Sequence, residues 1–588
     1  MPHIRVAALA LSLAASLGLT AQQPPATPAA PTPADQKCVV AGHVTNSVSG
    51  EPVKKVSVRL MRNGPVNVNT DSGPQAYTAI SEADGSFRIE GVDPGRYMLS
   101  GQKTGFIYTN YGAKKPLRQG TVLTLSPSQQ MTDINLALFP QAVISGKVVD
   151  EDGDPVGGAM VQAYVQSWQR GKLRYMPRGA TSANDLGEYR MSGLAPGKYY
   201  IAAQKMNFGM ADEEKSTPGK PEIRPVRTFY PEATSLATAS PVEVQPAQDL
   251  SGMDIRVHSA PTYHIRGKIA GNLPNSDNQR ISVSTTARDE DSMFMFAGQS
   301  MVKSDHTFDI SGVAPGSYMV NVFGMGGTFR VMGQQPVDVG QGDANDVVVN
   351  IVPAGSMHGQ VHIEGTPQAG APAFNMTNVT VRLTPEDMRM MGGPPPNGKA
   401  KQDGSFTLDN VAPGKYSVNS NAPQGTYLKS IRFGSQDILG KTLDLSGGAG
   451  GDLELTFRYG PGEVDATVQP AQDSAASSNG QPAALPSNIS VVLIPDVLNE
   501  DGSGIESSNA NQNGTSTLKN IPPGHYRAYA IEDFNYGAMQ NPDVQKQLEG
   551  KGTEVELKEN DKKQIQLPII TSDDMQQILA RLGLEDVQ

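Results

Sequence analysis

The chain has 588 residues, and its 48 Lys and Arg against 59 Asp and Glu leave a net charge of −11. That length is too great for one hydrophobic core and predicts several domains. The acidic balance, without any basic block, excludes nucleic acid and an anionic membrane surface as expected partners. The 62 Gly and 44 Pro are fewer than in typical disordered chains, so we expect a folded β protein rich in turns.

The N-terminal segment has the pattern of an export signal. Arg5 supplies a positive charge, residues 6–19 are apolar, and Ala21 is the expected cleavage residue. The apolar stretch is too short to span a bilayer, and no later stretch is long and apolar enough to do so. We therefore expect export to the periplasm, the cell surface or the extracellular space, without a membrane span.

One stretch of sequence occurs five times. Its first copy, "DGSFRIEGVDPGRYML", starts at Asp84, and related copies start at Asp185, Asp305, Asp403 and Asn513. Apolar residues alternate with polar ones on both sides of a Pro-Gly pair, which is the period of a half-buried strand. Pro presets the first central position of a type II turn, and Gly accepts a positive φ at the second. Each copy therefore predicts a strand, a tight corner and a second strand.

A tyrosine stands two positions after the glycine of every copy. After a corner, a tyrosine can pack its ring inward and donate its hydroxyl hydrogen back to the chain. No nucleophile or base recurs at a fixed position, so a structural role is favoured over five copies of a catalytic loop. The fifth copy departs from the others because Ser516 replaces the aromatic residue that precedes the corner. We expect the corner tyrosines Tyr97, Tyr199, Tyr318 and Tyr416 to be mostly buried.

The spacing of the repeats sets the expected domain size. Successive Pro-Gly pairs lie between 98 and 119 residues apart, which suits one β-sandwich each and is too long for a solenoid repeat. Near the C-terminus, apolar residues at helical spacing follow a Ser/Asp cap and predict a short helix. The predicted segments are a signal peptide over 1–21, a Pro/Ala-rich tether over 22–37, sandwiches over 38–139, 140–260, 261–354, 355–458 and a degenerate 459–570, and a C-terminal helix or tail over 571–588.

The repeated pattern resembles the carboxypeptidase regulatory-like domain, a transthyretin-like (prealbumin-like) sandwich of the carbohydrate-binding-like type. The pattern is G-x-V, a Gly/Asp/Pro turn, D-G-x-F and P-G-x-Y, and "VVDEDGDPVGGA" of the second copy is an especially close match. The resemblance covers nearly all of the mature chain and weakens in the fifth copy. It implies an all-β fold of tandem Ig-like or transthyretin-like sandwiches in an extended array, as in multi-domain exported bacterial proteins. In the first copy the matching residues are Gly42, Val44, Gly50, Pro52, Val53, Asp84, Gly85, Phe87, Pro94, Gly95 and Tyr97.

The sequence contains none of the catalytic patterns that the following motifs would signal. None of the eight histidines stands three residues before a glutamate, as a zinc carboxypeptidase requires, and no G-x-S-x-G elbow is present. His358 and His362 are spaced by four on a predicted strand, which separates them by about 13 Å. We therefore expect no enzyme activity, no cofactor and no metal site. The 23 methionines include clusters such as "SMFMFAGQSM" and "PEDMRMMGG", whose thioethers could hold Cu(I) or simply fill loops and cores.

Three functions remain open from the sequence. The first is a non-catalytic binding or scaffold protein of the cell envelope, whose partner is an envelope protein or a glycan. The second is a carbohydrate-binding protein, and the third handles Cu(I) through its methionine clusters. Sugars bind to aromatic platforms with polar neighbours, and one stretch, "YVQSWQRGKLRYMP", has that character; its alternative role is to cover the edge of its own sandwich. The candidate ligand-binding residues, expected on or beside a loop, are Tyr164, Trp168, Arg170, Arg174 and Tyr175.

Overall fold

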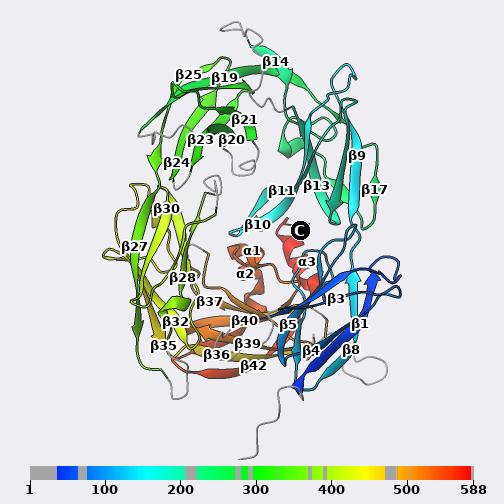
Figure 1. The fold of residues 1–588 in the computed structure, drawn as a ribbon, viewed down its shortest axis with the longest axis vertical. Coiled ribbons are helices and arrows are strands. Elements are labelled where there is room, and N and C mark those ends of the chain that lie inside the picture. The colour runs from blue at the N-terminus through cyan, green and yellow to red at the C-terminus, as the bar shows by residue number, and fades with distance from the viewer. Residues whose placement is uncertain are drawn as a thin grey trace, which may run out of the picture.

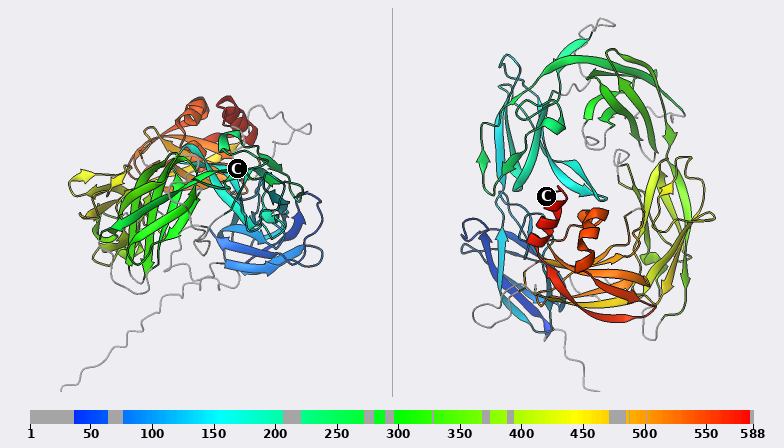
Figure 2. Two further views of the ribbon diagram at one scale, coloured as in Figure 1. Left: turned by 90° about the horizontal axis from the view of Figure 1, so that it is seen from above. Right: turned by 180° about the vertical axis from the view of Figure 1, so that it is seen from behind.

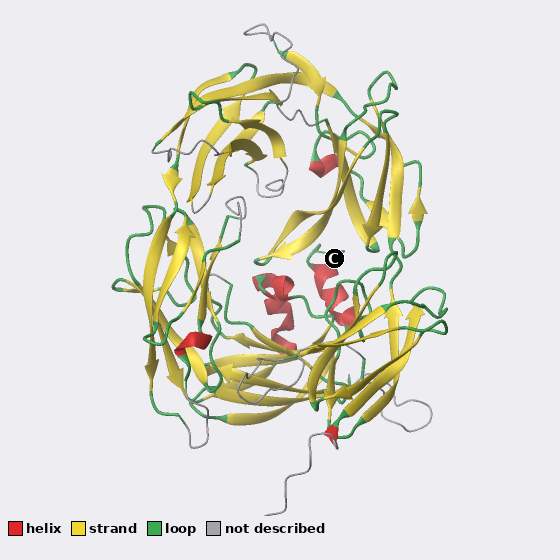
Figure 3. Ribbon diagram, viewed as in Figure 1, coloured by secondary structure: helices red, strands yellow, loops and turns green. Residues whose placement is uncertain are grey.

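Five β-sandwiches follow one another along the chain (Figures 1 and 3), so the predicted all-β class is confirmed. The predicted signal peptide and nearly all of the tether lie outside the described residues. In the part of the chain that the structure describes, no helix is long and apolar enough to cross a membrane. The computed structural model describes residues 36–63, 76–205, 221–271, 280–288, 296–326, 329–367, 374–387, 394–470, 485–486, 488–500 and 502–584.

All five sandwiches share one plan. In one sheet, the first strand of the sandwich pairs antiparallel with the strand before the Pro-Gly corner and parallel with the last strand. In the other sheet, the strand after the corner pairs antiparallel with the second strand. Apolar side chains that alternate along these strands fill a separate core between the sheets of each sandwich. The limits of independently folding domains stay a prediction.

Sandwiches 1 and 2 have sheet orders β4-β1-β8 with β3-β2-β5-β6, and β12-β9-β17 with β11-β10-β13-β15. In sandwich 1, β7 also pairs with β5; in sandwich 2, β16 pairs with β13 and β18 with β9. The strands of sandwich 1 are β1 (Cys38–Asn46), β2 (Ser57–Arg62), β3 (Ala76–Ile80), β4 (Ser86–Val92), β5 (Gly95–Gln102), β6 (Thr109–Asn110), β7 (Val122–Leu125) and β8 (Gln130–Leu138). Those of the sandwich 2 segment are β9 (Ala142–Val149), β10 (Met160–Gln169), β11 (Lys172–Ser182), β12 (Glu188–Leu194), β13 (Gly197–Gln204), β14 (Glu222–Pro225), β15 (Thr228–Phe229), β16 (Val242–Val244), β17 (Asp249–Leu250) and β18 (Ile255–Arg256).

Sandwiches 3 and 4 repeat the plan with sheet orders β14-β19-β22 with β21-β20-β23-β24-β26, and β30-β27-β35-β32-β33 with β29-β28-β31-β34; β25 also pairs with β19. The strands of sandwich 3 are β19 (Ser259–Ala270), β20 (Arg280–Ala287), β21 (Phe296–Met301), β22 (Thr307–Val313), β23 (Gly316–Gly326), β24 (Phe329–Val339), β25 (Ala344–Asn350) and β26 (Val352–Pro353). Those of sandwich 4 are β27 (Gly355–Glu364), β28 (Thr380–Pro385), β29 (Asn397–Lys399), β30 (Ser405–Val411), β31 (Lys415–Ser420), β32 (Thr426–Phe433), β33 (Gln436–Asp437), β34 (Leu443–Asp444) and β35 (Leu453–Tyr459).

Sandwich 5 differs from the others because its sheets join into one, in the order β38-β37-β40-β42-β36-β39, with β41 also on β40. A second apolar cluster unites this sheet with three helices, so the C-terminal helix predicted from the sequence is confirmed. The elements are β36 (Gly462–Gln469), β37 (Ile489–Pro495), β38 (Glu506–Asn509), β39 (Thr515–Ile521), β40 (Gly524–Glu532), α1 (Tyr536–Met539), α2 (Pro542–Leu548), β41 (Thr553–Leu557), β42 (Lys562–Ile570) and α3 (Ser572–Arg581). Short 3-10 helices lie at Leu236–Thr238, Met376–Asn378 and Glu549–Lys551.

The corner tyrosines make the same hydrogen bond in all five sandwiches. Each hydroxyl donates to the carbonyl oxygen four residues earlier, over 2.7 to 2.9 Å. Four of the rings are buried and that of Tyr318 is partly buried, so the predicted structural role is confirmed. The donors and acceptors are Tyr97 to Asp93, Tyr199 to Ala195, Tyr318 to Ala314, Tyr416 to Ala412 and Tyr526 to Pro522.

The prediction of a type II turn at the Pro-Gly corner is wrong. Gly95, Gly197 and Gly414 have φ of 156°, 149° and 155°, far from the value of about +80° that such a turn requires. The glycine instead continues into the following strand, where Gly95 pairs with Leu125. A Cβ on Gly95 would stand 3.4 Å from the Tyr97 ring. The missing side chain thus leaves room for the ring to fold back over the corner.

The sandwiches form a closed ring rather than the predicted extended array. Figures 1 and 2 show sandwich 1 beside sandwich 5, and the β10–β11 hairpin of sandwich 2 reaching toward α1 in the middle. The bridge that closes the ring joins Val122 to Asn511 in parallel. Short linkers indicated a string of domains, but contacts between the two ends of the string determine its shape.

Candidate functional site

The β10–β11 hairpin carries all five residues predicted to bind a ligand. They lie on paired strands and the two-residue turn between them, not on a loop that interrupts the sandwich. Arg170 and Gly171 at the turn have φ of 49° and 72°, the positive values of a type I′ turn, whose twist matches the flanking strands. The ten-residue β10 therefore continues to its end as a rigid ribbon and projects the turn beyond its own sandwich.

Trp168 packs against another sandwich. Its side chain is 5% exposed, and a Cβ added to Gly537 of α1 would lie 2.7 Å from the Trp168 Cβ. The Asn541 side-chain amide donates to the carbonyl oxygen of Gly171 over 2.9 Å. Trp168 is thus buried where β10 meets a helix of sandwich 5, and this burial removes the exposed aromatic platform on which the sugar-binding prediction depended.

Arg170 at the tip of the hairpin contacts sandwich 4. One guanidinium nitrogen donates to the Ser417 hydroxyl over 3.1 Å, and another lies 3.6 Å from a Glu386 carboxylate oxygen. Because the side chains of Arg170 and Glu386 are 39% and 29% exposed, the ion pair contributes little stability but fixes where the tip rests. Residues from sandwiches 2, 4 and 5 therefore meet at this tip.

The remaining candidate residues belong to the base and edge of the hairpin. Tyr164 is fully buried and donates its hydroxyl hydrogen to the Gln162 side chain over 2.6 Å, and desolvation raises its pKa. Tyr175 accepts a hydrogen bond from Gln166 over 3.0 Å. Its ring meets that of Tyr200 edge-on, with centroids 5.0 Å apart. Arg174 lies opposite Ser167 in the ladder. These contacts stiffen the hairpin; glycan binding stays a prediction.

Sandwiches 1 and 5 meet through side-chain amides of sandwich 5 that hydrogen-bond to backbone groups of sandwich 1. The Gln512 side chain accepts from the Thr124 amide and donates to the Thr124 carbonyl oxygen, each over 3.1 Å. Next to this pair, Val122 bridges to Asn511. The Asn509 side chain donates to the Gly120 carbonyl oxygen over 3.1 Å. Sandwich 5 therefore pairs with the edge of β7 and covers backbone groups that an edge strand leaves unpaired.

A buried carboxylate strengthens this closure. Glu532 is 4% exposed, and it is paired with Lys114 of sandwich 1. The other carboxylate oxygen accepts from the Ser572 amide at the start of α3 over 3.0 Å. Between the same two sandwiches, the backbone amide of Asn488 donates to the hydroxyl of Thr121 over 3.1 Å. Closure of the ring and docking of the C-terminal helix thus share one charged group.

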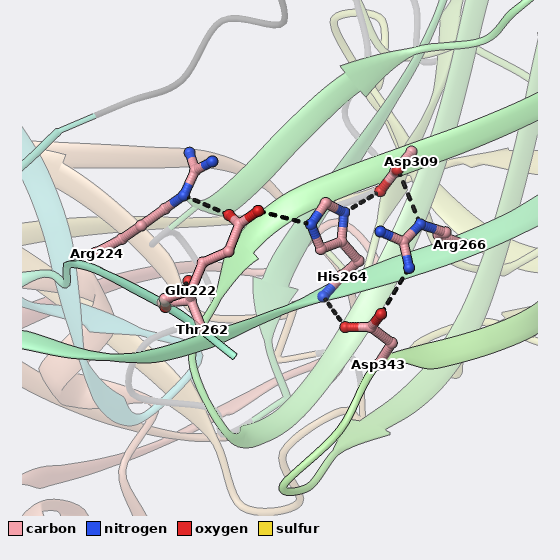
Figure 4. A network of polar contacts seen from close by, with 7 residues as sticks. All are labelled: Glu222, Arg224, Thr262, His264, Arg266, Asp309 and Asp343. Atoms are coloured by element: carbon pink, nitrogen blue, oxygen red, sulfur yellow. Dashed lines mark hydrogen bonds and ion pairs between the residues drawn. The ribbon is translucent and has the colours of Figure 1, made fainter. Parts of the chain in front are cut away.

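A network of charged side chains lies where sandwich 2 gives way to sandwich 3 (Figure 4). His264, 9% exposed on β19, donates from Nδ1 to Asp309 over 2.6 Å. Arg266 donates to Asp309 over 2.9 Å and to Asp343 over 2.6 Å. The hydrogen bond that His264 donates to Asp309, and the negative charge of Asp309, raise the pKa of His264. Despite burial, hydrogen bonds from His264 and Arg266 lower the pKa values of both aspartates.

Sequence reasoning missed this network and the ring closure. Arg266 stands directly opposite Asp309 in the antiparallel register, which was the one available signal, since oppositely charged cross-strand pairs recur in sheets. The His358 and His362 pair lies on β27 as expected, and no group of three or more His, Cys, Asp or Glu that could hold a metal occurs in the part of the chain that the structure describes. Residues 289–295 and 388–393, which include much of the methionine clusters, lie outside it.

A family model, the carboxypeptidase regulatory-like domain, matches residues 39–138 and 143–227. Sandwiches 1 and 2 resemble carboxypeptidase regulatory-like domains. The resemblance found in the sequence is thereby confirmed for these two sandwiches. No curated protein matches the chain.

Several solved structures are similar in part. The minor pilin GBS52 of Streptococcus agalactiae is 11% identical, with 41% of this chain and all of that one covered and a TM-score of 0.22. The major pilin BcpA of Bacillus cereus is 11% identical, with 72% and 99% covered and a TM-score of 0.14. The Bacillus anthracis TIE protein is 12% identical, with 72% and 73% covered and a TM-score of 0.15. Scores this low carry no argument about this chain.

Proposed function

We propose that this chain is an exported, non-catalytic binding and scaffold protein of the cell envelope, whose five sandwiches form one closed frame. The observation that carries the proposal is the junction of sandwiches 1 and 5 through the Val122–Asn511 bridge and the contacts of Gln512. A ring closed between its first and last sandwich has fewer relative motions than an open string of domains. Partner-binding surfaces on such a frame are therefore preorganised, which lowers the entropy lost on binding.

The buried groups support a non-catalytic role. His264 is the side chain best suited to act as a base by burial, but its ring nitrogens face Asp309 and Glu222. The neighbouring Thr262 hydroxyl is already donated to the Glu222 carbonyl oxygen over 2.9 Å. A nucleophile needs its hydroxyl in hydrogen-bond contact with the base, so this arrangement suits a structural ion cluster. The resemblance to a regulatory-like domain, which accompanies catalytic domains without reacting itself, points the same way.

Protein is the favoured class of partner. The only tryptophan of the chain is buried beside α1, so it offers no exposed aromatic surface on which a sugar could stack. Exposed apolar side chains remain on the sandwiches, among them Val497 and Ile80, which are 82% and 68% exposed. Such positions suit the introduction of cross-linking groups because they need no rearrangement of the core.

The test combines location with cross-linking in living cells. Photo-reactive residues at Val497 and Ile80 are introduced into the full-length chain and into a ring-opened variant, Lys114→Glu, which sets a second carboxylate beside Glu532. Lys115→Glu changes the charge of the exposed neighbouring residue and is the matched control. We expect a specific envelope protein to be cross-linked by the parent and by Lys115→Glu, and much less by Lys114→Glu. A cytoplasmic chain that retains Met1 would contradict the proposal. So would an equal yield of the cross-linked product from Lys114→Glu and from the parent.

A further inference from the structure

Strand β14 joins two sandwiches. It lies between β13 and β15 in the chain, within the segment that builds sandwich 2, yet it pairs with β19 of sandwich 3. In that register Glu222 stands opposite Thr262 and Pro225 opposite Ser259, so only the first third of β19 is used. The second half pairs with β22 and β25 inside sandwich 3. The β14–β19 ladder is therefore a fastening between neighbouring sandwiches.

One contact of this fastening is incomplete. His264 Nε2 is buried and has no hydrogen-bond partner, although it lies 3.6 Å from a carboxylate oxygen of Glu222. Because Nδ1 donates to Asp309, neutral His264 carries only a lone pair at Nε2. That lone pair faces a carboxylate oxygen, which can only accept. A proton on Nε2 would convert two opposed acceptors into a donor and an acceptor.

The surrounding charge favours that proton. The charged groups of the network around His264 are Glu222 and, bound to it, Arg224 from β14, Arg266 from β19, Asp309 from β22, and Asp343 from the loop before β25. Three carboxylates against two guanidinium groups leave one uncompensated negative charge, which a protonated imidazole neutralises. Arg224 is already held by Glu222 over 2.7 Å, so protonation would link the arginine, the glutamate and the histidine across both strands.

We propose that His264 is a proton-operated clamp, which fastens β14 to β19 through Glu222 when Nε2 is protonated and loosens this junction between sandwiches when it is not. The inference does not depend on the identity of any partner. It gives the closed frame one junction whose stiffness follows the acidity of the surroundings, which for an exported protein is that of the medium outside the cytoplasm.

The direction of the pH response follows from the linkage of protonation to structure. The pKa of His264 is raised by Asp309, so its contribution is complete below the ordinary histidine value of about 6.5 and is lost as the pH rises through the raised value. Asp309 and Asp343 have lowered pKa values, so they keep their charge in mildly acidic solution. The junction is thus tight in mild acid and loose in alkali.

A distance measurement between two spin labels tests the clamp in the full chain. Ile223 on β14 and Val348 on β25 are 65% and 36% exposed, and both are replaced by labelled cysteine in a Cys38→Ser background, because Cys38 is the only native cysteine. We expect one narrow distance at a pH of about 5.5 and a broader, longer distribution at a pH of about 9, on either side of the histidine range. Identical distributions at both values would overturn the proposal.

Two variants and a control make the assignment specific. Glu222→Gln supplies an amide donor to neutral Nε2, so its narrow distance should persist at the higher pH; a distribution that broadens as in the parent would overturn the proposal. His264→Gln should give the same distribution at both pH values, and retention of the parent's pH response would show that another group is responsible. His258→Gln removes the histidine that contacts Glu151 over 3.1 Å at the same junction and should behave as the parent does. Near-ultraviolet circular dichroism checks that each variant folds. If His264→Gln does not fold, Glu222→Gln still decides the question, because it adds a hydrogen-bond donor at the same contact.

Discussion

A glycine and the aromatic residue opposite it change together within this chain. In sandwiches 1 to 4, a glycine of the first strand faces the aromatic residue that precedes the corner, as Gly359 faces Phe406. A Cβ on Gly359 would lie 2.2 Å from the Phe406 ring and 2.5 Å from the Leu453 carbonyl oxygen. In sandwich 5 the facing pair is Ala466 and Ser516. The ring that lies over the strand, and the close approach of the last strand, therefore require the glycine.

We expect Gly359→Ala to destabilise sandwich 4 by about 1–3 kcal/mol, because overpacking forces the ring and the neighbouring strand apart. Urea unfolding followed by tyrosine fluorescence measures the loss. Gly447→Ala, in the same sandwich but with no atom within 4 Å of the added Cβ, should cost little. Equal effects of the two substitutions would contradict the packing argument.

The same pair can be tested in reverse in sandwich 5. Ser516→Phe alone should destabilise because its ring meets the Cβ of Ala466. Adding Ala466→Gly should recover part of that loss, although glycine alone weakens a strand by roughly 0.5–1 kcal/mol. A double-mutant cycle from unfolding curves gives the coupling energy, and strict additivity of the two changes would show that the pair is not coupled.

The hydroxyl of Tyr199 should govern part of the stability at high pH. Burial raises its pKa from 10.0 to about 12, so its contribution is complete below a pH of 10 and is lost as the pH rises through 12. Tyr199→Phe removes the bond to the Ala195 carbonyl oxygen and should cost about 1 kcal/mol, while Tyr199→Ala should cost about 3 kcal/mol or more. Stability curves between neutral and alkaline pH measure both effects. A Phe variant as sensitive to alkali as the parent in this sandwich would contradict the assignment.

At the scale of elements, the β10–β11 hairpin is the piece that links non-neighbouring sandwiches. Its length and its type I′ turn are set by residues close in sequence to Arg170-Gly171, although we expected a loop there from the sequence. What covers its tip is not local, because α1 lies more than 360 residues further along the chain. The sequence could therefore mark the stretch as unusual, but could not indicate that Trp168 meets Gly537.

The sole tryptophan makes this contact directly measurable. Gly537→Val should push α1 away from Trp168, because even a Cβ would stand 2.7 Å from the Trp168 Cβ. The indole then gains contact with water, and the fluorescence maximum should move to longer wavelength. Gly550→Val, at a glycine with nothing within 4 Å of an added Cβ, is the control. An unchanged emission spectrum in Gly537→Val would contradict the packing seen here.

At the scale of the whole molecule, some features are predictable from sequence and others are not. The corner tyrosines and the C-terminal helix followed from patterns within 20 residues. Ring closure depends on partners such as Thr124 and Gln512, which are 388 residues apart, and polar contacts of this kind leave no periodic signal. The His264 network likewise depends on the register between β19 and β22. An extended array was the natural expectation from short linkers alone.

Opening of the ring should be visible in solution. Lys114→Glu should raise the radius of gyration measured by small-angle X-ray scattering, since Glu532 is buried and loses its cationic partner. Moderate salt should reduce the difference only slightly, because a buried charge is poorly screened. Lys115→Glu should scatter as the parent does. Equal radii for the parent and Lys114→Glu would show that the polar contacts around Gln512 suffice for closure.

The two sides of the closing junction are synthesised at very different times, so the ring can close only after sandwich 5 has been made. The ribosome produces sandwich 1 first, and domains fold roughly in that order. The edge of β7 around Val122 therefore stays unpaired until Asn511 and Gln512 have been made, nearly 400 residues later. A product that stops before sandwich 5 keeps that edge bare, and bare strand edges are what proteases and aggregation exploit. Closure thus distinguishes finished molecules from fragments.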